Sequence, residues 1–245
     1  MVNMIASPEL YQHKEQAYLK VRNREGRVYP DAVLRMLPEV PDGHTYAAEW
    51  KHRRKTFERL LTYLKQRFGG NKLSILDVGC GNGWMSYNLA QAGHDVCAVD
   101  LNLLELQQAA RVFGSSGNQQ WIYADVLQDE IPGAPFDVVV MAASYQYFAE
   151  LDLLTNRLKK LLAPGGEIHI VDSMVYEPAQ VDAASHRSLD YYTGLEAPEM
   201  AAYYFHHSNH ALRQLGYKRR LSRNKFLSLL LPESSALQWW YCINK

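Results

Sequence analysis

Hydrophobic residues in the middle of this chain alternate between short apolar runs and runs with helical spacing. Apolar runs typical of buried parallel strands lie at 73–78, 95–100, 120–124, 136–142 and 167–172. Helical patterns follow them at 83–92, 102–113 and 150–162, and the second is expected to start at the N-cap Asn102 with Glu105 three residues on, an arrangement like a capping box. This regular alternation predicts an α/β fold with a Rossmann-like doubly wound sheet, mostly parallel, with helices on both faces.

The segments outside this alternation have weaker patterns. Residues 1–44 are polar and predict short helical pieces and loops, and an amphipathic helix is expected at 45–68. After the fifth strand we expect a helix over 199–215 and a C-terminal antiparallel strand pair, near 217–230 and 237–243. We therefore divide the chain into an N-terminal helical lid or extension, 1–68, and a main domain, 69–245, with a lid insertion at about 173–210.

Composition narrows the partners and the compartment. The 26 Lys and Arg residues balance 26 Asp and Glu residues, so no net field attracts a polyanion, which argues against nucleic acid. Cys80, Cys97 and Cys242 are too few and too far apart for a disulfide framework, which fits a reducing cytoplasm. The N-terminus has no apolar signal region and no apolar run is long enough to span a bilayer, so we expect a cytoplasmic protein with no membrane contact.

The sharpest local signal is a glycine-rich turn that leaves the first strand. Gly79, Gly81 and Gly83 stand at alternate positions after Asp77, where a parallel sheet binds ligands. The dinucleotide fingerprint needs a third glycine where this chain has Trp84, and the phosphate-binding Lys-Ser or Lys-Thr pair is absent. The turn therefore favours a ligand other than a dinucleotide pyrophosphate or a nucleoside triphosphate.

Two acids follow the next two strands. Asp100 ends the second strand, where a carboxylate can accept both hydroxyls of a ribose; alternatively it serves the dipole of the next helix. Asp125 follows the third strand and can accept from an adenine amino group while Val126 packs on the ring; alternatively it caps a short helix. A ribose and an adenine on neighbouring strands indicate an adenosine-containing ligand.

Taken together, these motifs resemble the class I S-adenosylmethionine-dependent methyltransferases from about Leu73 to the C-terminus. Asp77 and the three glycines fit the family pattern D/E-x-G-x-G-x-G, and FDVVVMAASYQYF and LKKLLAPGGEIHIVD resemble the family's fourth strand and the turn into its fifth. The resemblance implies S-adenosylmethionine as cofactor and S-adenosylhomocysteine as product. It also implies that the cofactor is contacted by Asp77, Gly79, Cys80, Gly81, Asn82, Gly83, Asp100, Leu101, Asp125, Val126, Met141, Ala142 and Ala143.

The expected reaction is an in-line methyl transfer to an oxygen, nitrogen or carbon nucleophile, for which the family has no universal catalytic residue. Ala142-Ala143-Ser144-Tyr145 is not the pattern used on nucleic-acid bases, so a small molecule is the expected acceptor. No catalytic residue and no metal site is assigned, because His206 and His210 have helical ligand spacing without a third ligand. A monomer or homodimer is expected, and the candidate acceptor residues are Tyr29, His44, Tyr145, His186 and His207.

Two other functions remain open from the sequence. A nucleotide-dependent oxidoreductase would bind nicotinamide, against which Trp84 weighs. A non-catalytic cofactor-binding regulatory domain would keep the same loop and acids, because these residues concern binding and not turnover. Fold resemblance does not decide the substrate.

Overall fold

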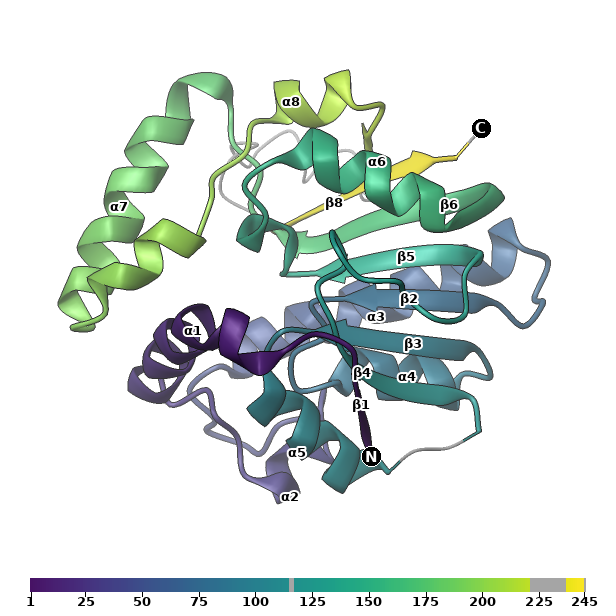
Figure 1. Cartoon of the computed structure of the whole chain (residues 1–245), viewed down its shortest axis with the longest axis horizontal. Helices are drawn as coiled ribbons and strands as arrows, with labels where there is room; N and C mark the ends of the chain where they lie inside the picture. The colour runs from purple at the N-terminus through teal and green to yellow at the C-terminus, as the bar shows by residue number, and fades with distance from the viewer. Residues whose placement is uncertain (115–116, 221–236, 245) are drawn as a thin grey trace.

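The computed structural model of the chain describes residues 1–114, 117–220 and 237–244. A sheet of eight strands in the order β1-β4-β3-β2-β5-β6-β8-β7 forms its centre (Figure 1). β8 runs antiparallel to β6 and β7, and the other pairings are parallel. The strands are β1 (Val2–Met4), β2 (Ser74–Val78), β3 (Asp95–Asp100), β4 (Gln119–Tyr123), β5 (Phe136–Ala142), β6 (Leu162–Ser173), β7 (Lys218–Arg219) and β8 (Gln238–Ile243).

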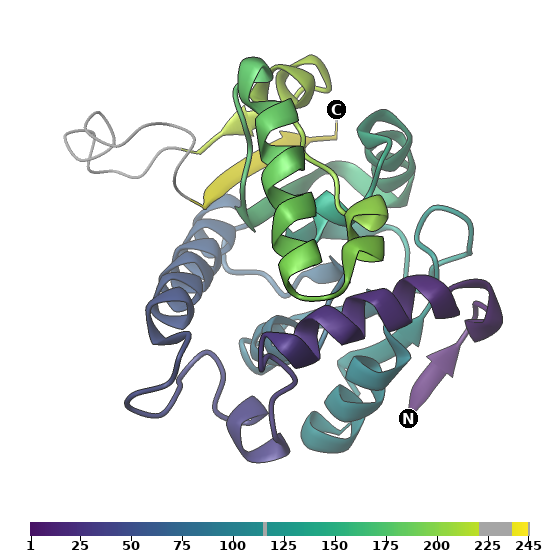
Figure 2. The same ribbon diagram turned by 90° about the vertical axis from the view of Figure 1, so that its left-hand side faces the viewer.

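Helices cover both faces of this sheet and one of its ends. One face carries α3 (Ala47–Arg67), α4 (Trp84–Gln91) and α5 (Leu103–Phe113), and the other carries α6 (Leu151–Leu161) and α8 (Asn209–Gln214). Beyond the carboxyl ends of the parallel strands stand α1 (Gln12–Arg24) and α7 (Val181–Gly194), from opposite parts of the chain (Figures 1 and 2). In the described part of the chain, no helix has the length and apolar character needed to cross a membrane. The remaining elements are α2 (Asp31–Leu34), η1 (Pro8–Leu10), η2 (Tyr145–Tyr147), η3 (Pro178–Gln180) and η4 (Pro198–Tyr203).

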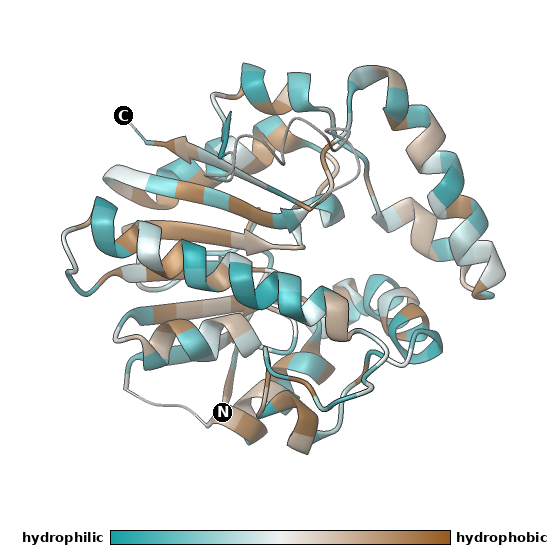
Figure 3. Ribbon diagram, turned by 180° about the vertical axis from the view of Figure 1, so that it is seen from behind, coloured by the Kyte–Doolittle hydropathy of each residue, from teal (hydrophilic) through white to brown (hydrophobic). Residues whose placement is uncertain are grey.

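Alternation along the central strands builds a core on each side of the sheet. Val138 and Val140 of β5 pack with the helices α3 and α4, whereas Val139 and Met141 pack with α6. All four side chains are fully buried. Residues with a period of two therefore face opposite layers, as expected for a strand buried on both faces. Figure 3 shows the contrast between apolar strands and the polar outer side of α3.

The predicted alternation of strands and helices from 73 to 173 is confirmed. The expected antiparallel C-terminal strands are also present, as β7 and β8. The rest of the first predicted strand, beyond residue 220, lies outside the described residues. The prediction for residues 1–44 was incomplete: α1 is a full helix of 13 residues, and β1 pairs in parallel with β4. The N-terminal segment thus contributes a strand to the sheet of the main domain.

The predicted helix over 199–215 is wrong. The chain forms η4, then an extended stretch at 204–208, and then α8, which begins after its N-cap Ser208. The amide of Phe205 donates to the carbonyl of Gln146 (2.8 Å), and the amide of Tyr176 donates to the carbonyl of His207 (3.1 Å). These long-range backbone bonds replace helical ones, so the local helical pattern is overridden by tertiary pairing.

Gly83 offers a test of how tightly the turn after β2 packs. Its φ is +75°, and a Cβ there would lie 2.4 Å from the Trp121 ring and 2.9 Å from Ala109. We expect Gly83→Ala to lower the free energy of unfolding by about 3 kcal/mol or more, since backbone strain adds to overpacking. Urea denaturation measures this loss.

Gly93→Ala is the matched control. Gly93 also has a positive φ, +98°, but a Cβ there meets nothing within 4 Å. Only strain of about 1–2 kcal/mol is expected for this variant. Equal losses for the two variants would contradict the packing argument.

Candidate functional site

The main cavity of the described structure lies at the carboxyl ends of the parallel strands and has a volume of about 730 Å³. Its floor comes from the ends of β2 to β6 and the turns that follow them. Its roof comes from α1 on one side and α7 with η4 on the other (Figure 2). In an open α/β sheet this edge is where ligands bind, and the volume suits a small-molecule site.

The two halves of the roof are docked on each other. Ala17 and Val21 of α1 share a buried apolar cluster with Tyr192, Ala197 and Met200. Polar contacts surround this cluster: Lys20 Nζ lies 2.9 Å from Glu199, Tyr191 donates to Glu25 (2.6 Å), and Arg24 pairs with Glu196. The cavity is therefore covered by segments that are more than 150 residues apart.

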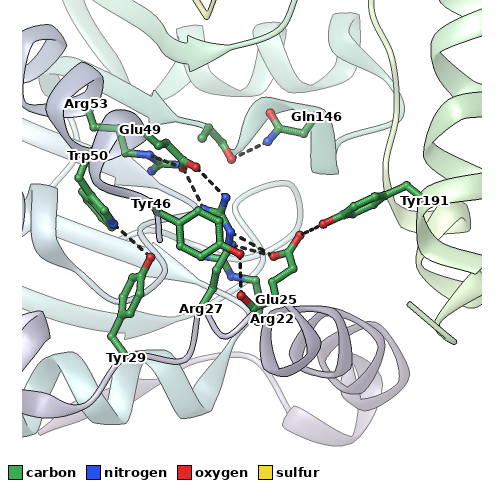
Figure 4. A network of polar contacts seen from close by, with 11 residues as sticks. Arg22, Glu25, Arg27, Tyr29, Tyr46, Glu49, Trp50, Arg53, Gln146 and Tyr191 are labelled. Carbon is green, nitrogen blue, oxygen red and sulfur yellow. Dashed lines mark hydrogen bonds and ion pairs between the residues drawn. The ribbon is translucent and has the colours of Figure 1, made fainter. Parts of the chain in front are cut away.

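Glu25 also belongs to a network of charges along one wall of the cavity (Figure 4). Arg22 and Arg27 both lie within ion-pair distance of Glu25, at 3.5 and 3.3 Å. Arg27 also pairs with Glu49 (2.6 Å), and Glu49 accepts from Arg53 (2.9 Å). This network joins the end of α1 to the start of α3 and presents guanidinium groups to the cavity.

Asp100 holds the glycine-rich turn in place. Its Oδ2 accepts from the amide of Gly81 and its Oδ1 from the amide of Asn102, each at 2.7 Å. Close packing within the protein itself requires glycine in this turn, because a Cβ on Gly79 would lie 2.5 Å from the Cβ of Ser144. Glycine at this position is therefore explained by contacts inside the turn, in addition to the predicted close approach of a ligand.

Asp77, at the floor of the cavity, is a buried acid with incomplete hydrogen bonding. Its Oδ2 accepts from Ser86 (2.6 Å), while its Oδ1 is buried without a hydrogen-bond partner. Burial raises the pKa of Asp77 to about 7, only partly opposed by the Ser86 bond. A carboxyl group in this state is stabilised in its charged form by any cation that enters the cavity.

Glu105 is a second buried acid, and its side chain does not form the capping box that the sequence predicts. Asn102 caps α5 as predicted, by accepting from the amide of Glu105 (3.0 Å). The return bond of a capping box is absent, because the amide of Asn102 donates to Asp100 instead. The Glu105 side chain lines the cavity, where burial raises its pKa to about 7 against the opposing charge of Arg22.

Asp125 lies on the far side of the cavity floor. Its Oδ1 accepts from the amide of Leu127 (2.9 Å) within a turn. No helix begins in this described stretch of the chain, so Asp125 is not the helix cap considered as an alternative. Its Oδ2 accepts from Tyr11 (3.0 Å), just before α1, and from Gln128 (3.0 Å). The N-terminal segment therefore reaches directly over this end of the cavity.

The structure brings together most of the residues expected to contact a cofactor. All of them line the cavity except Gly83, which packs against Trp121, and Met141, which is fully buried in the core. Those in the wall are Asp77, Gly79, Cys80, Gly81, Asn82, Asp100, Leu101, Asp125, Val126, Ala142 and Ala143.

The candidate acceptor residues lie outside this wall. The hydroxyl of Tyr29 accepts from the indole of Trp50 (3.1 Å), and His44 packs against the Tyr29 ring. Tyr145 is fully buried and donates to the carbonyl of Met174 (2.5 Å), and the His207 ring pairs with the carbonyl of Phe148 (2.9 Å). His186 is exposed on α7. These side chains support the site from behind or stand apart from it.

Other cavity residues escaped the sequence analysis. Tyr11, Lys14, Tyr18 and Arg22 come from the N-terminal segment, in which only Tyr29 and His44 were predicted as site residues. Asp172 lies near the end of β6, as the last residue of the motif LKKLLAPGGEIHIVD, from which no site residue was predicted. His206 and His210 do not share a helix, and no cluster of three potential metal ligands is found among the described residues.

The chain is similar to known methyltransferases in sequence. Residues 75–166 match the sequence model of the family described as "Methyltransferase domain". An uncharacterised methyltransferase of Mycobacterium tuberculosis is 35% identical over 97 residues, which cover 40% of this chain and 49% of that protein. A ubiquinone biosynthesis O-methyltransferase of Xylella fastidiosa is 33% identical over 114 residues, covering 45% of this chain and 46% of that protein. The chain thus spans about half the length of these curated relatives.

Solved structures extend the similarity of the fold over most of the chain. The magnesium protoporphyrin IX methyltransferase of Synechocystis, with bound S-adenosylhomocysteine, superposes with a TM-score of 0.59 at 15% identity. The alignment covers 94% of this chain and all of that one. At this identity the likeness concerns the fold alone.

The raised pKa of Asp77 predicts a pH dependence of stability in the protein without ligands. Between pH 4 and 7 the folded state holds a proton on Asp77 that the unfolded chain has released, so stability falls as pH rises through this window. Between pH 5 and pH 8 the free energy of unfolding decreases in the unsubstituted protein, and we expect this decrease to be smaller by on the order of 2–3 kcal/mol in Asp77→Asn. Urea denaturation of both proteins at the two pH values measures the difference.

Asp152→Asn, at an exposed acid in the first turn of α6, is the control. An unchanged pH dependence in Asp77→Asn would contradict the assignment.

Proposed function

We propose that this chain, which belongs to the class I S-adenosylmethionine-dependent methyltransferases, transfers a methyl group from that cofactor to a small-molecule acceptor. One observation carries the proposal: the acids and two of the three glycines of the family pattern line one cavity, which is roofed by α1, α7 and η4. The family match over residues 75–166 covers the turn and strands that form its floor.

The residues present fit a cationic, adenosine-containing cofactor. The cavity contains an unpaired buried oxygen on Asp77 and another on Glu105. Buried carboxylates without partners are costly, and a ligand that carries sulfonium and ammonium groups offsets that cost. Asp100 keeps lone pairs free for the hydroxyls of a ribose even while it accepts from Gly81 and Asn102.

Each part of the cavity wall is assigned a role on this basis. Asp100 holds the ribose, Asp125 and Val126 hold the adenine, and the turn from Gly79 to Asn82 lines the methionine portion. Arg53, which faces the cavity from α3, is positioned to pair with the cofactor carboxylate. Ala142 and Ala143, at the end of β5, mark the border between the cofactor and the acceptor.

When bound, S-adenosylmethionine supplies a methyl group already activated by the positive sulfur, which a nucleophile displaces in line. The chain contributes alignment and exclusion of water. The roof formed by α1, α7 and η4 covers the site, and aromatic side chains from it, among them Tyr18, Tyr192 and Tyr204, face the cavity. This lining favours an acceptor with apolar or aromatic surface.

Asp100 provides the direct test of cofactor binding. We expect Asp100→Asn and Asp100→Ala to weaken binding of S-adenosylmethionine and S-adenosylhomocysteine about 100-fold, since each charged hydrogen bond to a ribose hydroxyl contributes about 1.5–3 kcal/mol. Calorimetric titration measures the affinities, with NADH as a third ligand to test the oxidoreductase alternative.

Asp95→Asn is the matched control at the opposite end of the same strand. Asp95 forms only an exposed ion pair with Lys72, so its loss is expected to leave all affinities unchanged. Binding of NADH in place of the sulfur nucleosides would overturn the proposal in favour of an oxidoreductase. Cofactor binding without methyl transfer to any acceptor would favour a regulatory domain.

A further inference from the structure

Asp172, near the end of β6, has an unusual backbone conformation. Its φ is +52°, in the left-handed region that is uncommon for residues other than glycine, although asparagine and aspartate enter it more often than most. The pairing with β8 shifts at the same place: Ile170 faces Trp240 and Ser173 faces Gln238, so β6 has one extra residue. Such bulges redirect a side chain beside functional sites, and here the redirected side chain lines the cavity.

The carboxylate of Asp172 is buried without hydrogen bonds. Its side chain has 0% exposure, and neither oxygen has a hydrogen-bond partner. The ring of His52 on α3 lies beside the carboxylate, with Nε2 3.4 Å from Oδ1, and the His52 side chain is 41% exposed. Burying a carboxylate in this way costs stability.

Glu167, on the same strand, is a buried acid whose carboxylate is fully hydrogen-bonded, in contrast to that of Asp172. Its buried carboxylate accepts from Tyr63 (2.8 Å) and Arg67 (2.7 Å) and lies 3.1 Å from His169 Nε2. Glu167 is thus fully partnered in the middle of β6, outside the cavity wall. The contrast indicates that Asp172 is not retained for stability.

Asp172 lies on the acceptor side of the cavity. In the strand order β3-β2-β5-β6, the end of β6 is two strands, about 10 Å, from the glycine turn after β2. Between them stands Ala143, whose φ is also positive, +53°, and whose amide donates to the carbonyl of Val171 (2.9 Å). Beyond Asp172 the wall continues with Met174, Tyr176 and Tyr204.

From these observations, and resting on the methyl transfer proposed above, we propose that Asp172 is the catalytic proton acceptor for an acceptor hydroxyl, most simply that of an aromatic ring. The hydroxyl proton passes to the Asp172 carboxylate, while the oxygen lone pair forms the new bond to the methyl carbon. The carbon–sulfur bond breaks and its electron pair stays on sulfur, which leaves as a neutral thioether. His52, half-exposed beside the carboxylate, is a positioning residue that returns the proton to solvent.

The chemistry of a carboxylate favours a hydroxyl over an amine. An ammonium group beside Asp172 would be held in its protonated form, which is not nucleophilic. A neutral hydroxyl needs removal of its proton during attack, which is the case in which a positioned base contributes. The rings of Tyr176 and Tyr204 provide planar apolar surface for an aromatic acceptor.

A first experiment tests the assignment without an acceptor. We expect Asp172→Asn to raise the Tm by about 2–6 °C and Asp172→Gly, which also suits the left-handed backbone, not to lower it. The affinity for S-adenosylhomocysteine, measured by calorimetry, is expected to stay within about twofold of the unsubstituted protein. A lower Tm for Asp172→Asn would show that the carboxylate stabilises the fold and would overturn the proposal. The control is Asp152→Asn, an exposed acid on α6 far from the cavity wall.

A second experiment measures turnover with radiolabelled S-adenosylmethionine on phenols, aliphatic alcohols, amines and carboxylic acids. Methylation of phenols is expected, with kcat reduced about 10²- to 10⁴-fold in Asp172→Asn and KM little changed. His52→Ala is expected to lose about tenfold in kcat and to regain it with added imidazole, which a purely structural defect would not do. Methylation of amines alone, or full kcat in Asp172→Asn, would overturn the assignment. Failure of the unsubstituted protein to bind the cofactor would instead refute the proposed function.

Discussion

The two hydrogen bonds accepted by Asp100 connect the turns from which the floor of the cavity is built. One bond fixes Gly81 after β2 and the other fixes Asn102 before α5. Asn102 then caps α5, and the first turn of that helix directs Glu105 into the cavity. A single carboxylate at the end of β3 therefore determines where the glycine turn, the helix and a second acid lie. Because hydrogen bonds to a charged acceptor are strong, this arrangement is preorganised before any ligand arrives.

Among the described residues of the cavity wall, acidic side chains outnumber basic ones, and several of the acids have no basic partner. Asp77, Glu105 and Asp172 each have a buried oxygen without a hydrogen bond, whereas Arg27 and Arg53 are already paired with Glu49. Such an imbalance makes the folded chain less stable than a fully paired one. It also makes stability depend on ligands, since a cation bound only by the folded state shifts the unfolding equilibrium toward that state. The cost of the site and its affinity for a cationic cofactor thus have the same origin.

Features that depend on local sequence could be predicted, and those that depend on distant contacts could not. The strands, the glycine turn and the Asn102 cap follow from periodicity, glycine placement and short-range hydrogen bonds. The break between η4 and α8 follows from bonds to Tyr176 and Gln146, which are remote in sequence. Residue type alone also did not identify the side chains that line the cavity. Tyr145 is chemically suited to a substrate, yet its hydroxyl is satisfied by the carbonyl of Met174 within the core.

The same reasoning explains why Asp172 was not predicted as a site residue, although it ends the motif LKKLLAPGGEIHIVD. Its strand has the ordinary apolar pattern of a buried strand, and the bulge becomes visible only when β6 and β8 are paired. The proposed cofactor side of the cavity is built from turns between consecutive elements, so its residues form motifs. The proposed acceptor side combines α1, α3, β6 and α7, which meet only in the folded chain. On this proposal, substitutions in α1 or α7 reshape the acceptor site while the Asp100-centred floor stays intact, so substrate specificity changes independently of cofactor binding.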